Sequence, residues 1–154
     1  MTTTVANIIL APREREVLAG LADGETLPEV AFRLNIRRDT ASGYLKFAKQ
    51  KLHGVSEIPA AVAVAYATEA ITRPELRDPE LLYLPREQRE LVPLIAQGMP
   101  PGEMAAALRR PLATVRHDGR ELLRNLNAKN RAHVVSRGWQ YQILTADQVL
   151  AWLS

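Results

Sequence analysis

The stretches REVLAGLADG (residues 15–24) and RELVPLIAQG (residues 89–98) agree position by position when the sequence is shifted by 74 residues. Arginine, glutamate, alanine and glycine recur unchanged, and most of the remaining positions pair apolar residues. The agreement continues without a gap as far as Leu52 and Leu126. Because apolar and turn residues recur at a fixed distance, the sequence predicts one small tertiary unit used twice.

Each unit is predicted to contain four helices, so we expect an all-α protein. Proline suits the first turn of a helix, and apolar residues follow at helical spacing. The predicted helix starts are Pro12, Pro28, Arg38 and Pro59 in the first unit and Pro85, Pro101, Ala113 and Arg131 in the second. Gly24 and Gly98 are expected to end the first helix of each unit, because glycine readily adopts a left-handed conformation. Pro93 lies inside such a helix and is expected to kink it.

The third and fourth helices are predicted to form most of the core. The inward residues of the third helices are Ala41, Leu45, Ala48 and Leu52 in the first unit and Leu112, Val115, Leu122 and Leu126 in the second. The segment Ala60-Ala-Val-Ala-Val-Ala-Tyr66 in the fourth helix is apolar nearly all round, so it must be buried. The fourth helices could pair within the chain as a pseudo-dimer, or they could pair two chains as a homodimer.

The expected organisation is a first unit at residues 1–71, a linker at residues 72–82 and a second unit at residues 83–154. The linker contains two prolines and is predicted to be short and stiff. The pattern Thr145-Ala-Asp-Gln148 is typical of a capping box that starts a final short helix. This helix could dock on its own unit or present a surface to a partner.

Positive charge is concentrated in two segments at equivalent places. Residues 37–51 contain five basic residues and one acid, and residues 109–131 contain seven basic residues and two acids. Residues 13–29, by contrast, are acidic overall. Two discrete basic segments are the pattern of a protein that binds a polyanion such as nucleic acid.

Composition and motifs exclude several other functions. The chain contains no Cys, and its three histidines lack the spacing of metal ligands. No phosphate-binding glycine loop or catalytic triad is present, so we expect neither an enzyme nor a cofactor nor a metal. Glu29 and Glu103 recur at equivalent positions, which indicates a structural role such as pairing with an arginine. Met1-Thr-Thr-Thr4 is unlike a signal peptide and the longest apolar stretch is too short to span a bilayer, which favours a cytoplasmic protein.

Both units resemble the DNA-binding domain of LuxR/GerE-type (NarL/FixJ-type) bacterial regulators. In the first unit the resemblance rests on Pro12-Arg-Glu-Arg-Glu-Val-Leu18, Ala22-Asp-Gly24, Glu29-Val-Ala31 and Lys51-Leu52. In the second it rests on Glu103-Met-Ala105, Thr114-Val115 and Leu126-Asn-Ala-Lys-Asn-Arg-Ala-His-Val-Val135. The resemblance implies two tandem four-helix units of the helix-turn-helix type, whose third helix reads the major groove of duplex DNA.

The resemblance also implies which residues contact DNA. The base-facing positions are Ser42, Gly43 and Lys46 in the first unit and Arg116, His117 and Arg120 in the second. Contacts to phosphate are implied for Thr40 and Thr114, and Lys51 matches a lysine of the family that is implied to bind DNA, where the second unit has Asn125.

The residue types support this assignment. Arg116 and Arg120 are four positions apart and share one helical face, which Arg124 continues, and arginine matches the two acceptors of guanine. Further basic residues are expected at phosphates, namely Arg37, Arg38, Lys46, Lys49 and Arg110. Ser42 and Gly43 offer little side chain to a base, so the second unit is expected to be the main sequence reader.

The sequence therefore predicts a bacterial transcriptional regulator that binds duplex DNA. The alternative is a protein-interaction module with little DNA affinity, whose partner is RNA polymerase, a sigma factor or another regulator. The acid at Asp118 and the apolar C-terminal segment favour that alternative. Because nine residues precede the first repeated segment, which begins at Leu10, we expect no sensor domain there and regulation through expression level or a partner protein.

Overall fold

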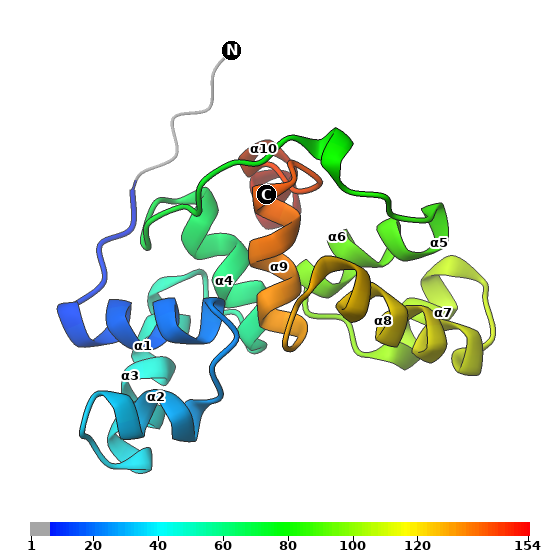
Figure 1. Cartoon of the computed structure of the whole chain (residues 1–154). Coiled ribbons are helices and arrows are strands. Elements are labelled where there is room, and N and C mark those ends of the chain that lie inside the picture. The colour runs from blue at the N-terminus through cyan, green and yellow to red at the C-terminus, as the bar shows by residue number, and fades with distance from the viewer. Residues whose placement is uncertain (1–6) are drawn as a thin grey trace.

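The computed structural model describes residues 7–154, which form helices joined by turns and contain no strand (Figure 1). The first half holds α1 (Pro12–Ala22), α2 (Leu27–Arg33), α3 (Arg38–Lys51) and α4 (Ile58–Ala67). The second half holds η1 (Pro79–Leu81), α5 (Arg86–Arg89), α6 (Leu91–Ala96), α7 (Pro101–Leu108), α8 (Leu112–Leu126), α9 (Arg131–Gln140) and α10 (Ala146–Leu153). The expected all-α class is confirmed.

The helices bear on whether the described part of the chain could cross a membrane. Within residues 7–154, every helix is too short or too polar to cross a bilayer. Met1-Thr-Thr-Thr4, which was judged unlike a signal peptide, lies outside the described residues.

Residues in the left-handed conformation mark the helix ends in both halves. Gly24 (φ 94°) ends α1 and Gly98 (φ 85°) ends α6, as predicted. Further left-handed residues also lie 74 positions apart: Asn35 and Arg109 before the third helices, and His53 and Asn127 after them. Residues other than glycine rarely adopt this conformation. Its recurrence at matching positions therefore indicates that the chain makes the same turns at these positions in both halves.

The helix that Pro93 was expected to kink is interrupted, and its two parts, α5 and α6, meet at Glu90. Proline lacks an N–H, and its ring clashes with the carbonyl four residues earlier, which here belongs to Arg89. The break falls beside that carbonyl. Helix α1, which has Ala19 at the matching position, is continuous.

The inner faces of α3 and α8 are those predicted, with one exception. The buried residues of these faces are Ala41, Leu45, Ala48 and Leu52 from α3, and Val115, Leu122 and Leu126 from α8. The prediction for Leu112 was wrong, since its side chain is 39% exposed. Leu112 is the first residue of α8, and this end of the helix projects beyond the part that the core covers.

Helix α4 lies at the centre of the core. Its residues from Ala60 to Ala67 are all buried, and the helix packs against α1, α6, α9 and α10. Figure 1 shows α4 and α9 side by side in the middle of the molecule. A helix without a polar face is stable only when it is surrounded. The expected burial of this segment is confirmed, and the cover comes from the same chain.

The two halves exchange equivalent contacts around α4 and α9. Helix α1 packs against α9 of the other half, and α6 packs against α4. A Cβ on Gly24 would lie 2.9 Å from His133 in α9, and one on Gly98 would lie 3.0 Å from Glu57 at the start of α4. Such reciprocity is the pattern of a two-fold interface. In this structure the fourth helices therefore pair within one chain.

Buried hydrogen bonds join α9 to the end of α1. The hydroxyl of Ser136 donates to the carbonyl of Ala22 (2.6 Å) and lies 2.8 Å from the hydroxyl of Tyr66. Because a serine hydroxyl has one proton, Tyr66 is the donor in the second bond. Burial raises the pKa of Tyr66, so the phenol keeps the proton that it donates. The side-chain amide of Asn130 donates to the carbonyl of Gly24 (2.9 Å).

The C-terminal helix α10 begins with the predicted capping box. Thr145 Oγ1 accepts from the N–H of Gln148 (3.3 Å), and Gln148 Oε1 accepts from the N–H of Thr145 (2.9 Å). The expectation that this helix docks on its own unit was wrong, because α10 packs against α4 in the first half. Val149 is buried there, and Trp152 is partly buried. The apolar face of α10 is thus used inside the chain, where α4 needs cover.

The linker at residues 72–82 is held against the second half. The N–H of Arg77 donates to the carbonyl of Gln140 (2.8 Å). The guanidinium of Arg73 lies 5.4 Å from the ring centre of Trp139, within the range of a cation–π contact. These contacts fix the linker to the end of α9.

One polar contact joins the first helix to the third helix in each half. Glu14 of α1 is buried, pairs with Lys51 of α3 (2.7 Å) and accepts from the N–H of Ala11 (3.0 Å). Burial disfavours the ionised carboxylate, but the bonds from Lys51 and Ala11 outweigh this and lower the pKa of Glu14. At the positions 74 residues later, the amide of Asn125 donates to Gln88 (2.7 Å). An ion pair in one half corresponds to a neutral amide pair in the other.

We expect Lys51→Ala to lower the free energy of unfolding by about 1–3 kcal/mol, because buried Glu14 loses its cation. The double variant Glu14→Gln/Lys51→Asn copies the amide pair of the second half and should lose less. Urea denaturation followed by circular dichroism measures both variants. An equal loss of unfolding free energy in the two variants would contradict the proposed role of this contact in holding α1 to α3.

Candidate nucleic-acid interface

Helix α3 presents most of its polar side chains to solvent. Thr40, Ser42 and Lys46 are exposed, as are Arg37 and Arg38 at its start, whereas Lys49 is half-buried. A Cβ at Gly43 would meet no atom within 4 Å, so the space beside this residue is open. The residues predicted to touch DNA in the first unit therefore lie off the buried face of α3, where a duplex can reach them.

Thr40 and Thr114 occupy the third position of their helices rather than the first. Helix α3 starts after Arg37 and α8 starts after Pro111, and neither of these residues caps its helix with a side chain. Helix starts leave backbone N–H groups without partners in the helix. Such groups suit phosphate oxygens, so both third helices begin with a feature that DNA binding can use.

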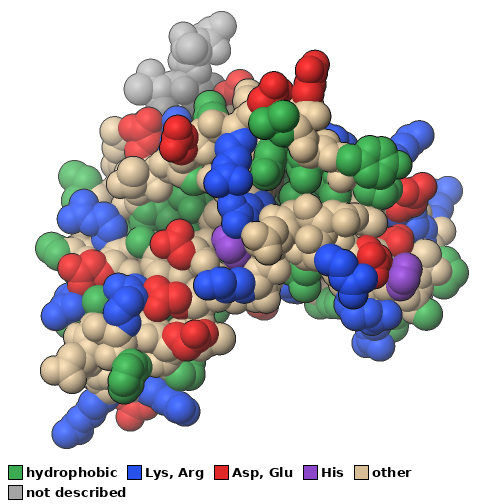
Figure 2. Space-filling view, in the orientation of Figure 1, with side chains coloured by type: hydrophobic (Ala, Val, Ile, Leu, Met, Phe, Trp, Pro, Cys, Tyr) green, Lys and Arg blue, Asp and Glu red, His purple; other side chains and the backbone are tan. Residues whose placement is uncertain are grey.

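Helix α8 carries a row of exposed arginines, Arg116, Arg120 and Arg124, with the exposed side chain of His117 beside Arg116. Arg124 lies 3.3 Å from Glu121. Among residues 7–154, no salt bridge involves Arg116 or Arg120. Figure 2 shows Lys and Arg side chains gathered over α8. This row has the charge and the reach to contact a polyanion.

Two residues predicted to bind DNA also have partners within the fold. Lys51 pairs with buried Glu14. Arg110, in the turn before α8, pairs with Glu90 and donates to the carbonyl of Glu87 (3.1 Å). Both cations hold the first helix of their half against the third helix. The DNA contacts of Lys51 and Arg110 stay predictions.

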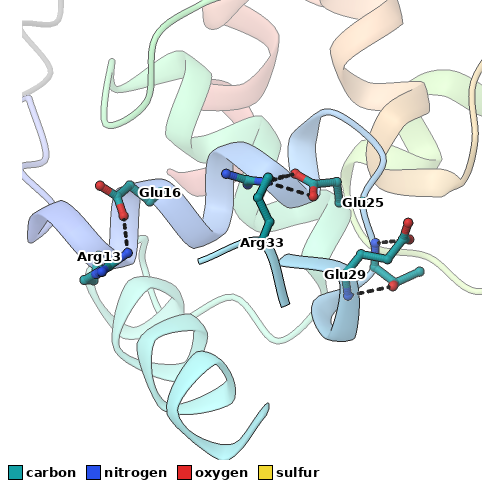
Figure 3. Close-up of polar contacts among 6 residues, drawn as sticks. Arg13, Glu16, Glu25, Glu29 and Arg33 are labelled. Atoms are coloured by element: carbon teal, nitrogen blue, oxygen red, sulfur yellow. Dashed lines mark hydrogen bonds and ion pairs between the residues drawn. The ribbon is translucent and has the colours of Figure 1, made fainter. Parts of the chain in front are cut away.

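Acidic residues of α1, of α2 and of the turn between them find partners within the first half (Figure 3). Glu16 pairs with Arg13 (2.9 Å), and Glu25 pairs with Arg33 (2.8 Å). Glu29 accepts from the N–H of the N-cap residue of α2 (2.9 Å). The structural role expected for Glu29 is thus helix capping and not arginine pairing. This acidic region lies on different helices from the exposed cations of α3.

Helices α2 and α3 and the left-handed turn between them form a helix-turn-helix. Residues 8–65 match the family described as bacterial regulatory proteins, luxR family. This segment is a LuxR-type helix-turn-helix domain. The domain implies a DNA-binding transcriptional regulator, and it is typical of regulators that are not enzymes. The resemblance predicted for the first unit is confirmed.

The family match does not extend to the second half of the chain, so the second copy stays a prediction. No curated protein and no solved structure matches the chain. Within the described part of the chain, no three acidic or histidine side chains are grouped as a metal site would need.

Sequence analysis missed two residues beside α8. Gly119 occupies the position that buried Leu45 has in α3. The alignment of the two units contained this signal, since a core leucine in one unit is matched by no side chain in the other. Arg131, at the start of α9, is partly buried and its Nε atom has no hydrogen-bond partner. Only its three-dimensional surroundings reveal this.

We expect the Arg116→Ala/Arg120→Ala protein to keep its free energy of unfolding within about 0.5 kcal/mol, because exposed side chains contribute little to stability. Arg110→Ala should lose about 1–3 kcal/mol, since Glu90 loses a donor. Chemical denaturation of the variants in one buffer compares the two kinds of arginine. A loss in the double variant as large as that of Arg110→Ala would assign its arginines to the fold.

Proposed function

We propose that this protein is a transcriptional regulator that binds duplex DNA through two helix-turn-helix units in one chain. Helices α3 and α8 each enter a major groove, and successive grooves are about 10 bp apart. The observation that carries the proposal is the row of exposed cations on α8. It stands on the helix that corresponds to α3, the third helix of the LuxR-type domain.

The backbone supports a second unit of the same type. Three left-handed residues of the second half, Gly98, Arg109 and Asn127, lie 74 positions after left-handed residues of the first. The bond between Gln88 and Asn125 joins the positions that match Glu14 and Lys51. Turn geometry and a contact between distant residues therefore agree with the same register. Pro93 interrupts a helix that is continuous in the first unit, which is one reason for weaker sequence similarity.

We assign sequence reading mainly to α8. Arginine binds guanine through two parallel hydrogen bonds, and one such contact discriminates bases by about 1–3 kcal/mol. Arg116 and Arg120 offer two guanidinium groups on one exposed face. Helix α3 offers Ser42, Gly43 and Lys46 at the matching positions, so its contacts are mainly with phosphates, which position the protein without specifying sequence.

The pairing of α4 with α9 supports a pseudo-dimer within one chain. The equivalent contacts that the halves exchange are those that two copies would make across a two-fold axis. Because α4 is buried from Ala60 to Ala67, it offers no face to a second chain. One chain therefore supplies both helix-turn-helix units.

A duplex selected from a random pool should bind the protein with an affinity that falls steeply with salt, because phosphate contacts release counterions. Fluorescence anisotropy should show that Arg116→Ala/Arg120→Ala weakens binding to the selected site by at least about tenfold, from the loss of base contacts. Lys46→Ala is the matched control: it should weaken all sequences about equally and lower the salt slope by about 1. Unchanged specificity in the double variant would contradict the role of α8.

Sedimentation analysis should find one chain per particle, and one chain per selected duplex, since the fourth helices are already paired. A stable dimer without DNA, or two chains on each half-site, would contradict the pseudo-dimer.

A second candidate is a protein-interaction module. Phe32 on α2 is 90% exposed and Phe47 on α3 is 53% exposed, and exposed aromatic residues are common at protein interfaces. The segment Ala60–Tyr66 and Trp152, once expected to serve such a role, are packed inside the chain. In an interaction module, Phe32→Ala would abolish partner binding, and Arg116→Ala/Arg120→Ala would leave it intact.

A further inference from the structure

Helix α8 borders a cavity at the place where α3 has a core side chain. Leu45 is buried in the first half, and Gly119 stands at the matching position of α8. A Cβ built on Gly119 would meet no atom within 4 Å. The space beside it is a cavity of about 230 Å³ between α6, α7, α8 and the start of α9.

The cavity has an apolar interior and a cationic rim. Its apolar walls are Ile95, Met104, Val115, Leu123 and Val134, and its guanidinium groups belong to Arg116, Arg120 and Arg131. The Nε atom of Arg131 is buried and has no hydrogen-bond partner. Burial lowers the pKa of Arg131, although the charge of Glu57 acts in the opposite direction. The guanidinium of Arg131 also donates to the carbonyl of Met99, so Nε is the one donor of this group that is buried without a partner.

We propose that this cavity binds a small organic monocarboxylate with an apolar body. A carboxylate matches the planar donors of a guanidinium. Because Gly119 has no side chain, the apolar walls beside it lack atoms to pack against. The apolar body of a ligand would supply these contacts. The cavity is smaller than the roughly 300–1,000 Å³ of pockets that hold drug-sized molecules. Its ligand is accordingly a short alkyl chain or a single aromatic ring that carries one carboxylate.

This site would regulate DNA binding, an inference that rests on the proposed function. Arg116 and Arg120 line the cavity and are also the proposed readers of bases. A carboxylate bound at the rim competes with DNA for the same donors. The ligand should therefore weaken DNA binding without any change in oligomeric state.

Isothermal titration of the whole chain with octanoate, in the absence of DNA, tests the site directly. Octanoate should bind saturably with one site per chain. Acetate lacks the apolar body and 1-octanol lacks the charge, so each should bind at least tenfold more weakly. Gly119→Leu places in α8 the side chain that α3 has, and it should weaken octanoate binding at least tenfold. Gly102→Leu is the matched control, because Gly102 is an exposed helical glycine with open space around it.

A second variant keeps the proposal testable if leucine disturbs α8. Arg131→Gln leaves the cavity open but removes a charge, so it should reduce the preference for octanoate over 1-octanol at least threefold. No saturable binding of octanoate to the unchanged protein, or equal binding by the Gly119→Leu protein, would overturn the proposal.

Anisotropy with a selected duplex then tests the regulatory step. Octanoate should weaken DNA binding by the unchanged protein at least threefold and should have no effect on Gly119→Leu. Octanoate binding by a protein that binds no DNA would refute the proposed function and leave the site standing. DNA binding by a protein that does not bind octanoate would refute the ligand site and leave the proposed function standing.

Discussion

Helix α4 has no polar face, and this constraint organises the molecule. Its buried run from Ala60 to Ala67 requires cover on every side. Helix α1 supplies cover from the same half, whereas α6, α9 and α10 supply it from the second half. Burial of apolar surface contributes about 25 cal/mol per Å², so separating the halves would expose α4 to water at a large cost in free energy.

Apolar burial alone does not fix how the halves are oriented, because the hydrophobic effect has no direction. Orientation comes from the buried polar bonds at the same interface. The hydroxyl of Ser136 donates to the carbonyl of Ala22 at the end of α1 and accepts from the hydroxyl of Tyr66, and the partly buried amide of Asn130 donates to the carbonyl of Gly24 in the turn that follows α1. A shift of α9 along α4 would leave these buried groups without partners, which is costly. Apolar packing provides the free energy that holds the two halves together, and the hydrogen bonds fix the position of α9 along α4.

The sequence predicted what local signals determine. Proline and glycine placed the helix ends, and the spacing of Val115, Leu122 and Leu126 implied that Arg116 and Arg120 face outward. The sequence does not show which distant residues become partners. The charges of Lys51 and Arg110 are visible in the sequence, whereas their pairing with Glu14 and Glu90 depends on the fold. The docking of α10 depends in the same way on the uncovered side of α4.

The pairing of α4 and α9 inside one chain also affects how the protein would respond to its own abundance. A regulator that must first assemble from two chains occupies its sites with a threshold in concentration. With both halves in one chain, site occupancy under the proposed function follows a simple hyperbola in protein concentration. Each half has its own stretch of the sequence, so a substitution in one half leaves the other half unchanged. The two grooves that they contact need not carry mirror-related sequences, and a palindromic operator is not required.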